Sequence, residues 1–236
     1  MTMPTQEKQD LLMALWEEYA ACELCALAHP EGRDRRHMVF GSGNPDAKVV
    51  IIDEAPDEHE DASGKIFSGN DGALLDSYLA GVHSSRAEVF LLKAVGCRAT
   101  RAEDDGYLRH RPAAKEEVQA CQARLHRVIE IIDPYVLLVL GNTAIKALLK
   151  VRPSVTSMAR NPTVPTYDAY TQGQCTLVKR TAYVSFPMQY LLRPENAAME
   201  HGSDRHHAFR TWLKAFQTAD MYHHIYTGAT LPTRGE

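Results

Sequence analysis

Three short runs of almost wholly apolar residues constrain the fold of this chain more than any other feature. They cover residues 48–52, 89–92 and 135–140. Strands of this composition are typical of a parallel sheet that is buried on both faces. Apolar residues at helical spacing over 74–79 and 118–132 mark helices between the runs. This alternation predicts an α/β fold, a three-layer α/β/α sandwich around a central, mainly parallel four-stranded sheet, with the ligand site at the carboxyl ends of the strands.

The second half of the chain adds one more strand and a terminal helix. Residues 181–185 form a fourth strand candidate, and helical spacing covers residues 204–217. Residues 151–176 are rich in Pro, Thr and Ser, which predicts a long excursion with little regular structure. We therefore expect a single domain over residues 1–220, followed by a loosely held C-terminal tail over 221–236.

Composition is that of a soluble globular protein. Of the 236 residues 44% are hydrophobic, which is enough for an ordinary core. No run approaches the roughly 18 apolar residues that a membrane span needs, and the first residues are polar where a signal peptide is apolar. We expect a monomer in the reducing cytoplasm, with no membrane partner.

Charge gives no global attraction to nucleic acid, because the net charge is −4. Any contact with DNA must therefore come from local basic patches. One patch covers residues 33–37, and another covers residues 98–115, where acidic residues dilute it. Solvated loops carry similar charge, so these patches alone do not establish DNA binding.

Four of the five cysteines lie beside structural boundaries. Cys22 and Cys25 follow an amphipathic helix over residues 6–21, and Cys97 and Cys121 lie far downstream, which leaves Cys175 as the spare. In a reducing compartment an odd count argues against a disulfide framework and for metal ligation. A Cys-x-x-Cys pair alone suits zinc, a redox dithiol or an iron–sulfur cluster equally well. The four predict a metal or iron–sulfur site that joins the start of the chain to its middle.

The first apolar run is followed by a motif suited to catalysis or ligand binding. It leads into Asp53-Glu-Ala-Pro-Asp57 and then into a glycine-rich loop over residues 64–72 that carries Phe67. A carboxylate at the mouth of a parallel strand can act as an acid or base, glycines let the backbone approach a ligand, and an aromatic ring can stack on it. The pattern favours a nucleobase pocket, although an acidic turn followed by a plain loop would give it too.

The order of these motifs resembles the uracil-DNA glycosylase superfamily in its iron–sulfur family 4, over roughly residues 18–217. That family has a strand ending in Gly-Glu-Ala-Pro-Gly, then Glu-Asp, then Gly-x-x-Phe-x-Gly-x-x-Gly before a leucine-rich helix. It also has Cys-x-x-Cys before this strand, Cys-Arg after the next and Ala-Cys in the following helix. The matching residues here are Asp53, Glu54, Ala55, Pro56, Asp57, Glu60, Asp61, Gly64, Phe67, Gly69, Gly72, Leu74, Leu75, Cys22, Cys25, Cys97, Arg98, Ala120 and Cys121.

The resemblance implies a four-iron, four-sulfur (4Fe-4S) cluster held by Cys22, Cys25, Cys97 and Cys121, with zinc as the alternative. The cluster would be structural. It would pin the N-terminal segment and the loop after Cys97 to the core, where that loop can present basic residues to phosphates.

The resemblance also implies roles for single residues. Glu54 would orient the attacking water or stabilise the oxocarbenium-like sugar, and Phe67 would stack on a base flipped out of the duplex. The expected substrate pocket comprises Asp53, Ala55, Asp57, Gly64, Phe67, Gly69, Lys93 and Phe186.

The same comparison implies a DNA-binding surface. Residues 140–149 look like the family's strand-Gly-helix unit, whose Asn142 or Thr143 could bind a phosphate, and Leu191-Leu-Arg193 like the end of its DNA-inserting loop. Leu191 or Leu192 would wedge into the gap left by flipping, although simple core packing explains these leucines as well. The expected DNA contacts are Arg98, Arg101, Asn142, Thr143, Leu191, Leu192 and Arg193.

Four positions depart from the family pattern. Lys93 stands where the family reads uracil with an asparagine, and Phe186 stands where it has a histidine that stabilises the departing base. Asp53 and Asp57 replace the two glycines of the first motif. Either the substrate base differs, or catalysis is weak or lost and the chain is a DNA-binding protein.

The 23 residues between Cys97 and Cys121 are similar to an insertion in the superfamily's X branch. There a histidine attacks the sugar after base loss and leaves a covalent link to DNA. His110 lies at the corresponding offset, and neutral imidazole is a competent nucleophile, although a solvated loop histidine is the simpler interpretation.

The leading hypothesis is a DNA glycosylase that hydrolyses the N-glycosidic bond of a flipped uracil or modified pyrimidine in single- or double-stranded DNA. A catalytically inactive DNA-binding protein, a glycosylase that crosslinks through His110 and a zinc-stapled protein unrelated to DNA remain as alternatives.

Overall fold

The computed structural model describes residues 3–28, 38–104, 107–148, 154–160, 167–172 and 177–227. The basic patch expected at residues 33–37 and the spare Cys175 lie outside these ranges. The helices are α1 (Thr5–Ala20), α2 (Glu58–Ser63), α3 (Asn70–Gly81), α4 (Lys115–Ile132), α5 (Gly141–Leu148), α6 (Val155–Arg160), α7 (Met188–Leu191) and α8 (Asp204–Thr227), with short 3-10 helices at Ala26–Ala28 and Pro194–Asn196.

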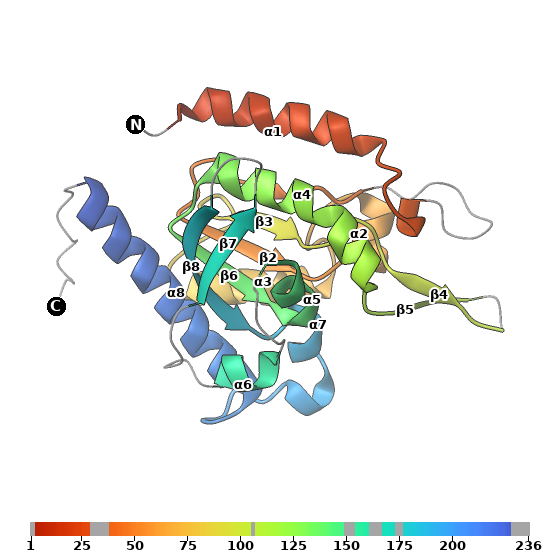
Figure 1. Cartoon of the computed structure of the whole chain (residues 1–236). Coiled ribbons are helices and arrows are strands. Elements are labelled where there is room, and N and C mark those ends of the chain that lie inside the picture. The colour runs from red at the N-terminus through yellow and green to blue at the C-terminus, as the bar shows by residue number, and fades with distance from the viewer. Residues whose placement is uncertain are drawn as a thin grey trace.

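The main sheet has the strand order β1-β3-β2-β6-β8-β7 (Figure 1). Its strands are β1 (Ser42–Gly43), β2 (Val49–Asp53), β3 (Phe90–Lys93), β6 (Val136–Leu140), β7 (Tyr167–Gln172) and β8 (Leu177–Ser185). The neighbours β3, β2, β6 and β8 are parallel, as their apolar composition predicted. The two outer strands, β1 and β7, are antiparallel to their neighbours.

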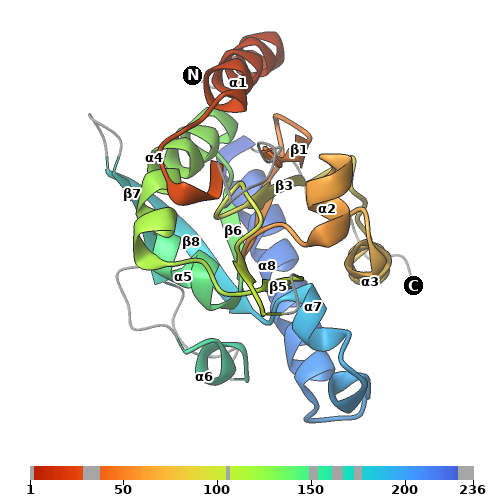
Figure 2. The same ribbon diagram turned by 90° about the vertical axis from the view of Figure 1, so that its right-hand side faces the viewer.

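Successive residues of the buried strands face opposite layers, because side chains alternate across a strand. Val50 and Ile52 of β2 pack in the cluster that includes α1, α4 and α5. Ile51 packs in the second cluster, with α3 and with Trp212 of α8. Figures 1 and 2 show the helices on both faces of the sheet. The three-layer α/β/α sandwich is therefore confirmed.

The sheet is wider than the predicted four strands. β1 spans only two residues, which is too short to leave a periodic signal. β7 and α6 lie inside residues 151–176, so the expectation of little regular structure there was wrong for these two elements. Pro, Thr and Ser mark the ends of short elements as readily as a long loop, and tertiary pairing decided between them.

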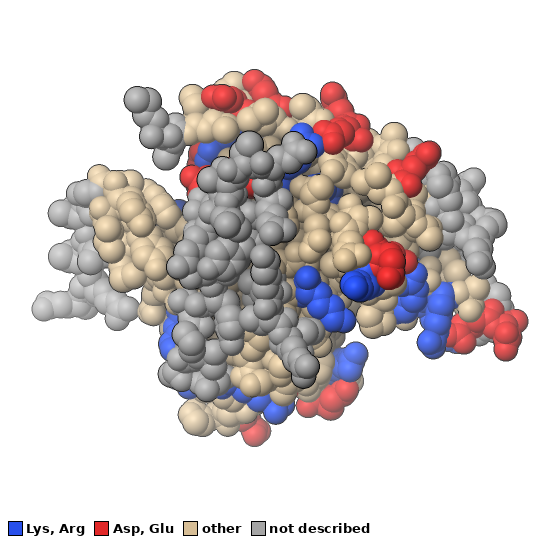
Figure 3. All heavy atoms as spheres, viewed as in Figure 1, with Lys and Arg blue, Asp and Glu red and all other residues tan. Residues whose placement is uncertain are grey.

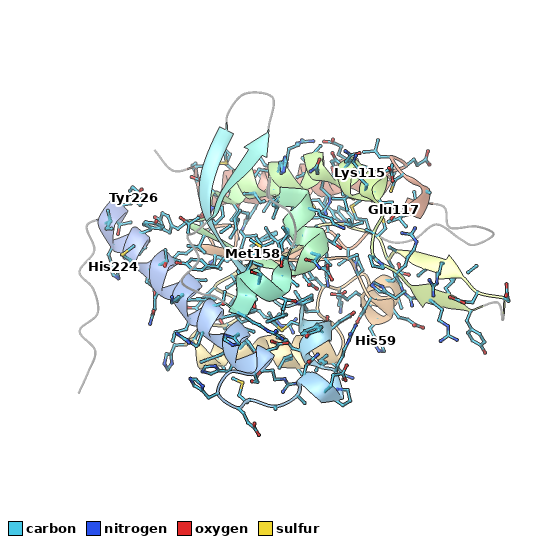
Figure 4. The ribbon with its side chains drawn as sticks, turned by 60° about the horizontal axis from the view of Figure 1, so that its bottom comes forward. His59, Lys115, Glu117, Met158, His224 and Tyr226 are labelled. Atoms are coloured by element: carbon cyan, nitrogen blue, oxygen red, sulfur yellow. The ribbon has the colours of Figure 1, made fainter. Side chains whose placement is uncertain are left out.

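The last helix also extends beyond the predicted residue 217. α8 continues to Thr227, so the boundary expected at residue 220 falls inside a helix. Tyr226 stacks on Tyr135, which precedes β6, with ring centroids 5.8 Å apart and planes at 12°. Figure 4 shows Tyr226 and His224 at the end of α8. This aromatic contact stabilises the final turns, and the division into a domain and a tail stays a prediction.

The insertion between Cys97 and Cys121 contains a hairpin of β4 (Thr100–Ala102) and β5 (Leu108–His110), which pairs Thr100 with His110. In Figure 1 this hairpin projects from the right-hand side of the domain.

Candidate functional site

Glu54 follows β2 directly and is held by the start of α5. One carboxylate oxygen accepts a hydrogen bond from the backbone N–H of Thr143 at 2.8 Å. The first N–H groups of a helix have no partner within it, so they favour a carboxylate there. Burial raises the pKa of Glu54, although the Thr143 N–H lowers it in part. The helix start expected to bind a phosphate through Thr143 therefore holds the candidate catalytic carboxylate instead.

Gly141 makes the room that Glu54 needs. Its φ is +86°, a conformation that favours glycine. A Cβ at this position would lie 2.5 Å from Cδ of Glu54 and 2.7 Å from Cγ of Pro187. Any side chain here would displace the carboxylate. Beside it, Asn142 accepts a hydrogen bond from the N–H of Val155 at 3.2 Å.

Lys93 is the centre of a buried ion cluster. Its ammonium nitrogen lies 2.7 Å from Oδ2 of Asp53 and 2.9 Å from Oε2 of Glu60. Lys93 has an exposed fraction of 0%. Burial disfavours its charge, but the two carboxylates outweigh this effect and raise its pKa. The ammonium stays charged within the core.

Glu60 also organises the loop around it. Asp57 caps α2 by accepting from the N–H of Glu60, and Glu60 accepts in return from the N–H of Asp57, which forms a capping box. Glu60 accepts a further hydrogen bond, 2.6 Å long, from the N–H of Phe67. Phe67 has φ of +50° and an exposed fraction of only 1%. Glu60 therefore sets the positions of both Phe67 and Lys93.

Lys93 lies over the aromatic ring that was expected to stack on a base. Its ammonium nitrogen is 4.5 Å from the ring centroid of Phe67. A cation at this distance is attracted to the face of the ring. The two side chains are thus in contact, and Ala55, which was also expected at the pocket, is buried as well.

Three carboxylates of this pocket come close together. Oxygens of Asp57, Glu60 and Asp71 all lie within 4.8 Å of one another, and Asp71 is 2% exposed. Burial raises the pKa of Asp71 and of Glu60. Such a group can bind a metal ion, but the Lys93 ammonium already bonds Glu60. The Lys93 ammonium therefore supplies the positive charge in this cluster of carboxylates.

The segment after β8 closes the other side of the site. Phe186 is 1% exposed and stacks on Tyr190 with centroids 5.1 Å apart. Gln189 donates to Oδ2 of Asp57 over 3.2 Å. Gly64 ends α2 in the left-handed conformation with φ of +67°, and Gly69 precedes α3. The two glycines thus mark the ends of the Phe67 loop.

The two candidate wedge leucines differ. Leu191 has an exposed fraction of 0% and belongs to the hydrophobic cluster under α3 and α8, so it packs in the core and is not placed to enter DNA. Leu192 is half-buried and Arg193 is exposed. The guanidinium of Arg193 lies 5.5 Å from the ring centroid of Tyr190. Of these three residues, Leu192 and Arg193 remain candidates for contact with DNA.

The hairpin brings basic residues and His110 to one edge of the molecule. Arg98 pairs with Glu58 at 3.0 Å, and Arg101 pairs with Glu103 at 2.7 Å. Figure 3 shows Lys and Arg side chains beside Asp and Glu at this edge. His110 is exposed on β5. Desolvation and the charge of Arg98 lower its pKa, which favours the neutral imidazole.

The four expected ligand cysteines lie at one core cluster. Cys97 and Cys121 are buried, and Cys22 and Cys25 are half-buried against the same hydrophobic residues. Burial, with the charges of the other three, raises the pKa of Cys97 to about 12. Burial also raises the pKa of Cys25, so the thiols of Cys25 and Cys97 need a cation or a metal group before they can ionise together.

Arg124 supplies part of that compensation. It is 0% exposed and lies one turn after Cys121 on α4. Its Nη2 donates to the carbonyl of Lys93 at 2.6 Å, and its Nη1 to the carbonyl of Phe40 at 3.1 Å. Its Nε donates to no described residue. A buried donor without a partner beside four thiols fits an anionic group with sulfur acceptors.

The spacing of the thiols bears on the zinc alternative. Across the part of the chain that the structure describes, no three of the cysteine sulfurs lie within 4.8 Å of one another. Tetrahedral zinc with Zn–S bonds of about 2.3 Å would hold its sulfurs about 3.8 Å apart. No three of the described cysteine sulfurs are therefore spaced as a bound zinc ion would hold them.

Sequence reasoning gave no individual role to three residues that organise the site: Glu60, Gly141 and Arg124. Asp57 and Glu60 are spaced as a capping box, and this signal could have identified the role of Glu60 at the loop. Gly141 follows a buried strand and begins a helix, where a glycine often permits close packing. For Arg124 the sequence holds no signal, because its partners are backbone carbonyls of distant segments.

Comparison with known proteins identifies the family. The family model described as the uracil DNA glycosylase superfamily matches residues 40–217. The chain belongs to this superfamily, and its relatives place it in family 4.

Three of these relatives are named type-4 uracil-DNA glycosylase. The chain is 31% identical to that of Thermotoga maritima over 156 residues, which cover 66% of this chain and 75% of the relative. Identity is 33% to that of Saccharolobus solfataricus and 32% to that of Sulfurisphaera tokodaii, covering 60% and 58% of this chain. The chain spans only 60% and 57% of the length of these two.

No helix among the described residues is long and apolar enough to cross a membrane.

Proposed function

We propose that this chain is a DNA glycosylase, which hydrolyses the N-glycosidic bond of a flipped uracil or related pyrimidine in DNA. The observation that carries this proposal is the placement of Glu54. Its carboxylate lies at the carboxyl end of β2, is partly buried, and is oriented by the N–H of Thr143. Ligand sites of open α/β sheets lie at this edge.

For this reaction Glu54 must be ionised and correctly placed next to the sugar. Its carboxylate takes a proton from the attacking water as the C1′–O bond forms and the C1′–N bond breaks. The base leaves with the bonding electron pair. While positive charge grows on the sugar, the carboxylate also stabilises it. The raised pKa of Glu54 makes it a better base than an exposed carboxylate.

Phe67 and Lys93 support the assignment of the base pocket. The backbone N–H of Phe67 is held by Glu60, and its ring lies beside Lys93, which pairs in register with Asp53 before Glu54. Phe186 cannot donate a hydrogen bond to the departing base, so Lys93 is the cation that could stabilise its charge. Arg98, Arg101, Leu192 and Arg193 would contact the DNA backbone or the gap left by the flipped base.

Cys22, Cys25, Cys97 and Cys121 would hold a 4Fe-4S cluster, which would join the segment after α1 to the end of β3 and to α4. The Nε of Arg124, which has no partner among the described residues, supports an anionic acceptor group at this site. A reducing cytoplasm would keep these thiols available. The cluster would have a structural role, and the chain is proposed to act as a monomer.

A crosslinking reaction through His110 is a second candidate. Its lowered pKa favours the neutral imidazole that a nucleophile requires. An adduct with uracil DNA that survives denaturing electrophoresis and is lost in His110→Ala would support it. Persistence of the adduct in that variant would exclude His110 as the attacking group.

The direct test of glycosylase activity uses the purified, cluster-loaded protein with single- and double-stranded oligonucleotides that carry uracil or modified pyrimidines. Abasic sites are revealed by alkaline strand cleavage. We expect cleavage by wild type and by Glu17→Gln, a change at an exposed carboxylate on α1, and none by Glu54→Gln. DNA binding without base release from any oligonucleotide would instead identify a binding protein.

A further inference from the structure

Two of the departures from the family pattern are direct neighbours in the sheet. Asp53 ends β2 and Lys93 ends β3, and the parallel register pairs them. Their side chains share a hydrogen bond of 2.7 Å. In the family pattern these two positions hold a glycine and an asparagine. The two differences are therefore one coupled change, because a lone lysine or a lone aspartate would leave an additional charge uncompensated here.

Each of the two residues has one hydrogen-bonding group without a partner among the described residues. A lysine ammonium has three N–H donors. The ammonium of Lys93 has two carboxylate partners among the described residues, Asp53 and Glu60, which leaves one donor. Oδ2 of Asp53 accepts from Lys93, while its Oδ1 is buried and has no partner in the described structure. A buried acceptor without a partner is costly and calls for a donor.

The pair thus offers one donor and one acceptor at adjacent positions. A side-chain amide offers the same combination from a single residue. The donor lies 4.5 Å from the ring centroid of Phe67, so the pair borders the ring that the resemblance assigns to the base pocket. Lysine alone lacks the acceptor, and Asp53 supplies it.

We propose that Asp53 and Lys93 form a two-residue reader that replaces the single amide and selects pyrimidines with an N–H beside a carbonyl. This assignment rests on the proposed function. Asp53 accepts from N3–H of the base and Lys93 donates to its O4. The substrate class is uracil and its C5-substituted relatives, while N3-substituted bases and cytosine are excluded.

The pair is closed to solvent when no base is bound. Lys93 is 0% and Asp53 is 4% exposed, and Phe67 beside them is 1% exposed. A base therefore reaches them only after the surrounding side chains move. Because Lys93 keeps Glu60 as a second partner, it remains paired while Asp53 turns its free oxygen to the base.

Binding of uncleavable DNA tests the reader independently of catalysis. A fluorine at C2′ of the target nucleoside destabilises the developing positive charge on the sugar and blocks bond cleavage. Single-stranded oligonucleotides would carry this sugar with uracil, N3-methyluracil or cytosine. We expect wild type to bind the uracil strand about 10–100-fold more tightly than the other two, the range for hydrogen bonds to charged groups.

Three variants separate reading from folding. Asp53→Gly keeps the Lys93–Glu60 pair, so it should fold, and we expect its preference for uracil to fall near unity. Lys93→Asn leaves two buried carboxylates without their cation and should lower the midpoint of thermal unfolding (Tm). The double variant Asp53→Gly/Lys93→Asn restores an amide, and its preference should return. Glu17→Gln on α1 is the matched control.

The outcomes are distinct. If Asp53→Gly changes only the Tm and keeps the preference for uracil, the two residues do not read the base. Their ion pair would then have a structural role alone. Tighter binding of cytosine than of uracil by wild type would also overturn the reader. Selective binding of the uncleavable uracil strand, with no cleavage of ordinary uracil DNA, would support the reader and refute the glycosylase.

Discussion

The cysteine site and the base pocket are both built on the end of β3, yet they follow the family pattern to different degrees. Lys93 ends this strand, and Cys97 lies four residues further on. All four cysteines match the family, and they converge on one core cluster. The pocket differs at Asp53, Asp57, Lys93 and Phe186. The comparison teaches that the departures in the pocket are coupled, since the charges at two of these positions pair with one another.

Arg124 joins the two regions physically. Its guanidinium donates to the carbonyl of Lys93, while the charges of Cys121 and Cys97 act on it. The predictions below test whether the two regions are as separate as their sequences suggest, in order of expected effect.

Glu54→Gln should have the largest effect on catalysis. We expect base release to fall by about 10²–10⁴-fold, the range for loss of a general base. The raised pKa of Glu54 means that the folded state favours the protonated form, so the ionised form is destabilising at neutral pH. The variant should therefore have an unchanged or higher Tm. Single-turnover assays and thermal unfolding measure both, and a large fall in Tm would instead assign Glu54 a structural role.

Cys121→Ser should affect the other region first. Loss of one ligand should remove the visible absorbance and the bound iron of the purified protein and lower its Tm. Cys175→Ser is the control, because Cys175 is not among the four expected ligands. If Cys121→Ser keeps its full iron content, the ligand set is wrong.

Gly141→Ala should move Glu54 without removing it. The added Cβ would meet the carboxylate at 2.5 Å, and the φ of +86° is unfavourable for alanine. We expect base release to fall by about 10–100-fold, as misplacement of a catalytic group predicts, with a stability loss of about 1–3 kcal/mol. Gly202→Ala, which also has φ of +86° but open space around it, is the matched control for backbone strain.

The acid limb of the pH profile should report Glu54. Activity needs its ionised form, so kcat/KM should fall as the pH drops through the pKa of Glu54. Burial places this pKa above its usual value of about 4.3. Thr143→Pro removes the N–H that lowers the pKa, at a position in the first turn of α5, so the limb should move to higher pH. Thr143→Ala keeps the N–H and loses the hydroxyl, which also lowers this pKa, so its limb should move less; a shift of equal size in that variant would contradict the assignment.

Arg101→Ala should have the smallest effect. Its guanidinium is exposed on β4 and pairs with Glu103, so removing it should leave Tm unchanged. We expect DNA affinity to fall a few-fold and the salt dependence of binding to weaken by about 0.7–0.9 in the logarithmic slope. Lys214→Ala on α8 is the comparison, and equal losses in both variants would show that the hairpin is not the DNA-binding surface.

Sequence reasoning located the strands and the long helices because their apolar patterns are local. β2, β3 and β6 were found within one residue of their bounds. It missed β1 and β7 because edge strands form through pairing with a neighbour rather than through periodicity. At the site, Glu54, Phe67 and Lys93 were identified, but Lys93 was considered alone, since its partner lies 40 residues away.

The sequence by itself determined the α/β alternation, the four cysteines and the carboxylate at the end of β2, because each is carried by residue types at short spacing. Only the tertiary structure decided that Thr143 orients Glu54, that Leu191 is core, and that Asp53 and Lys93 form one unit. These depend on the parallel register and on close packing between distant segments. Both arise from summed long-range contacts that no local pattern encodes.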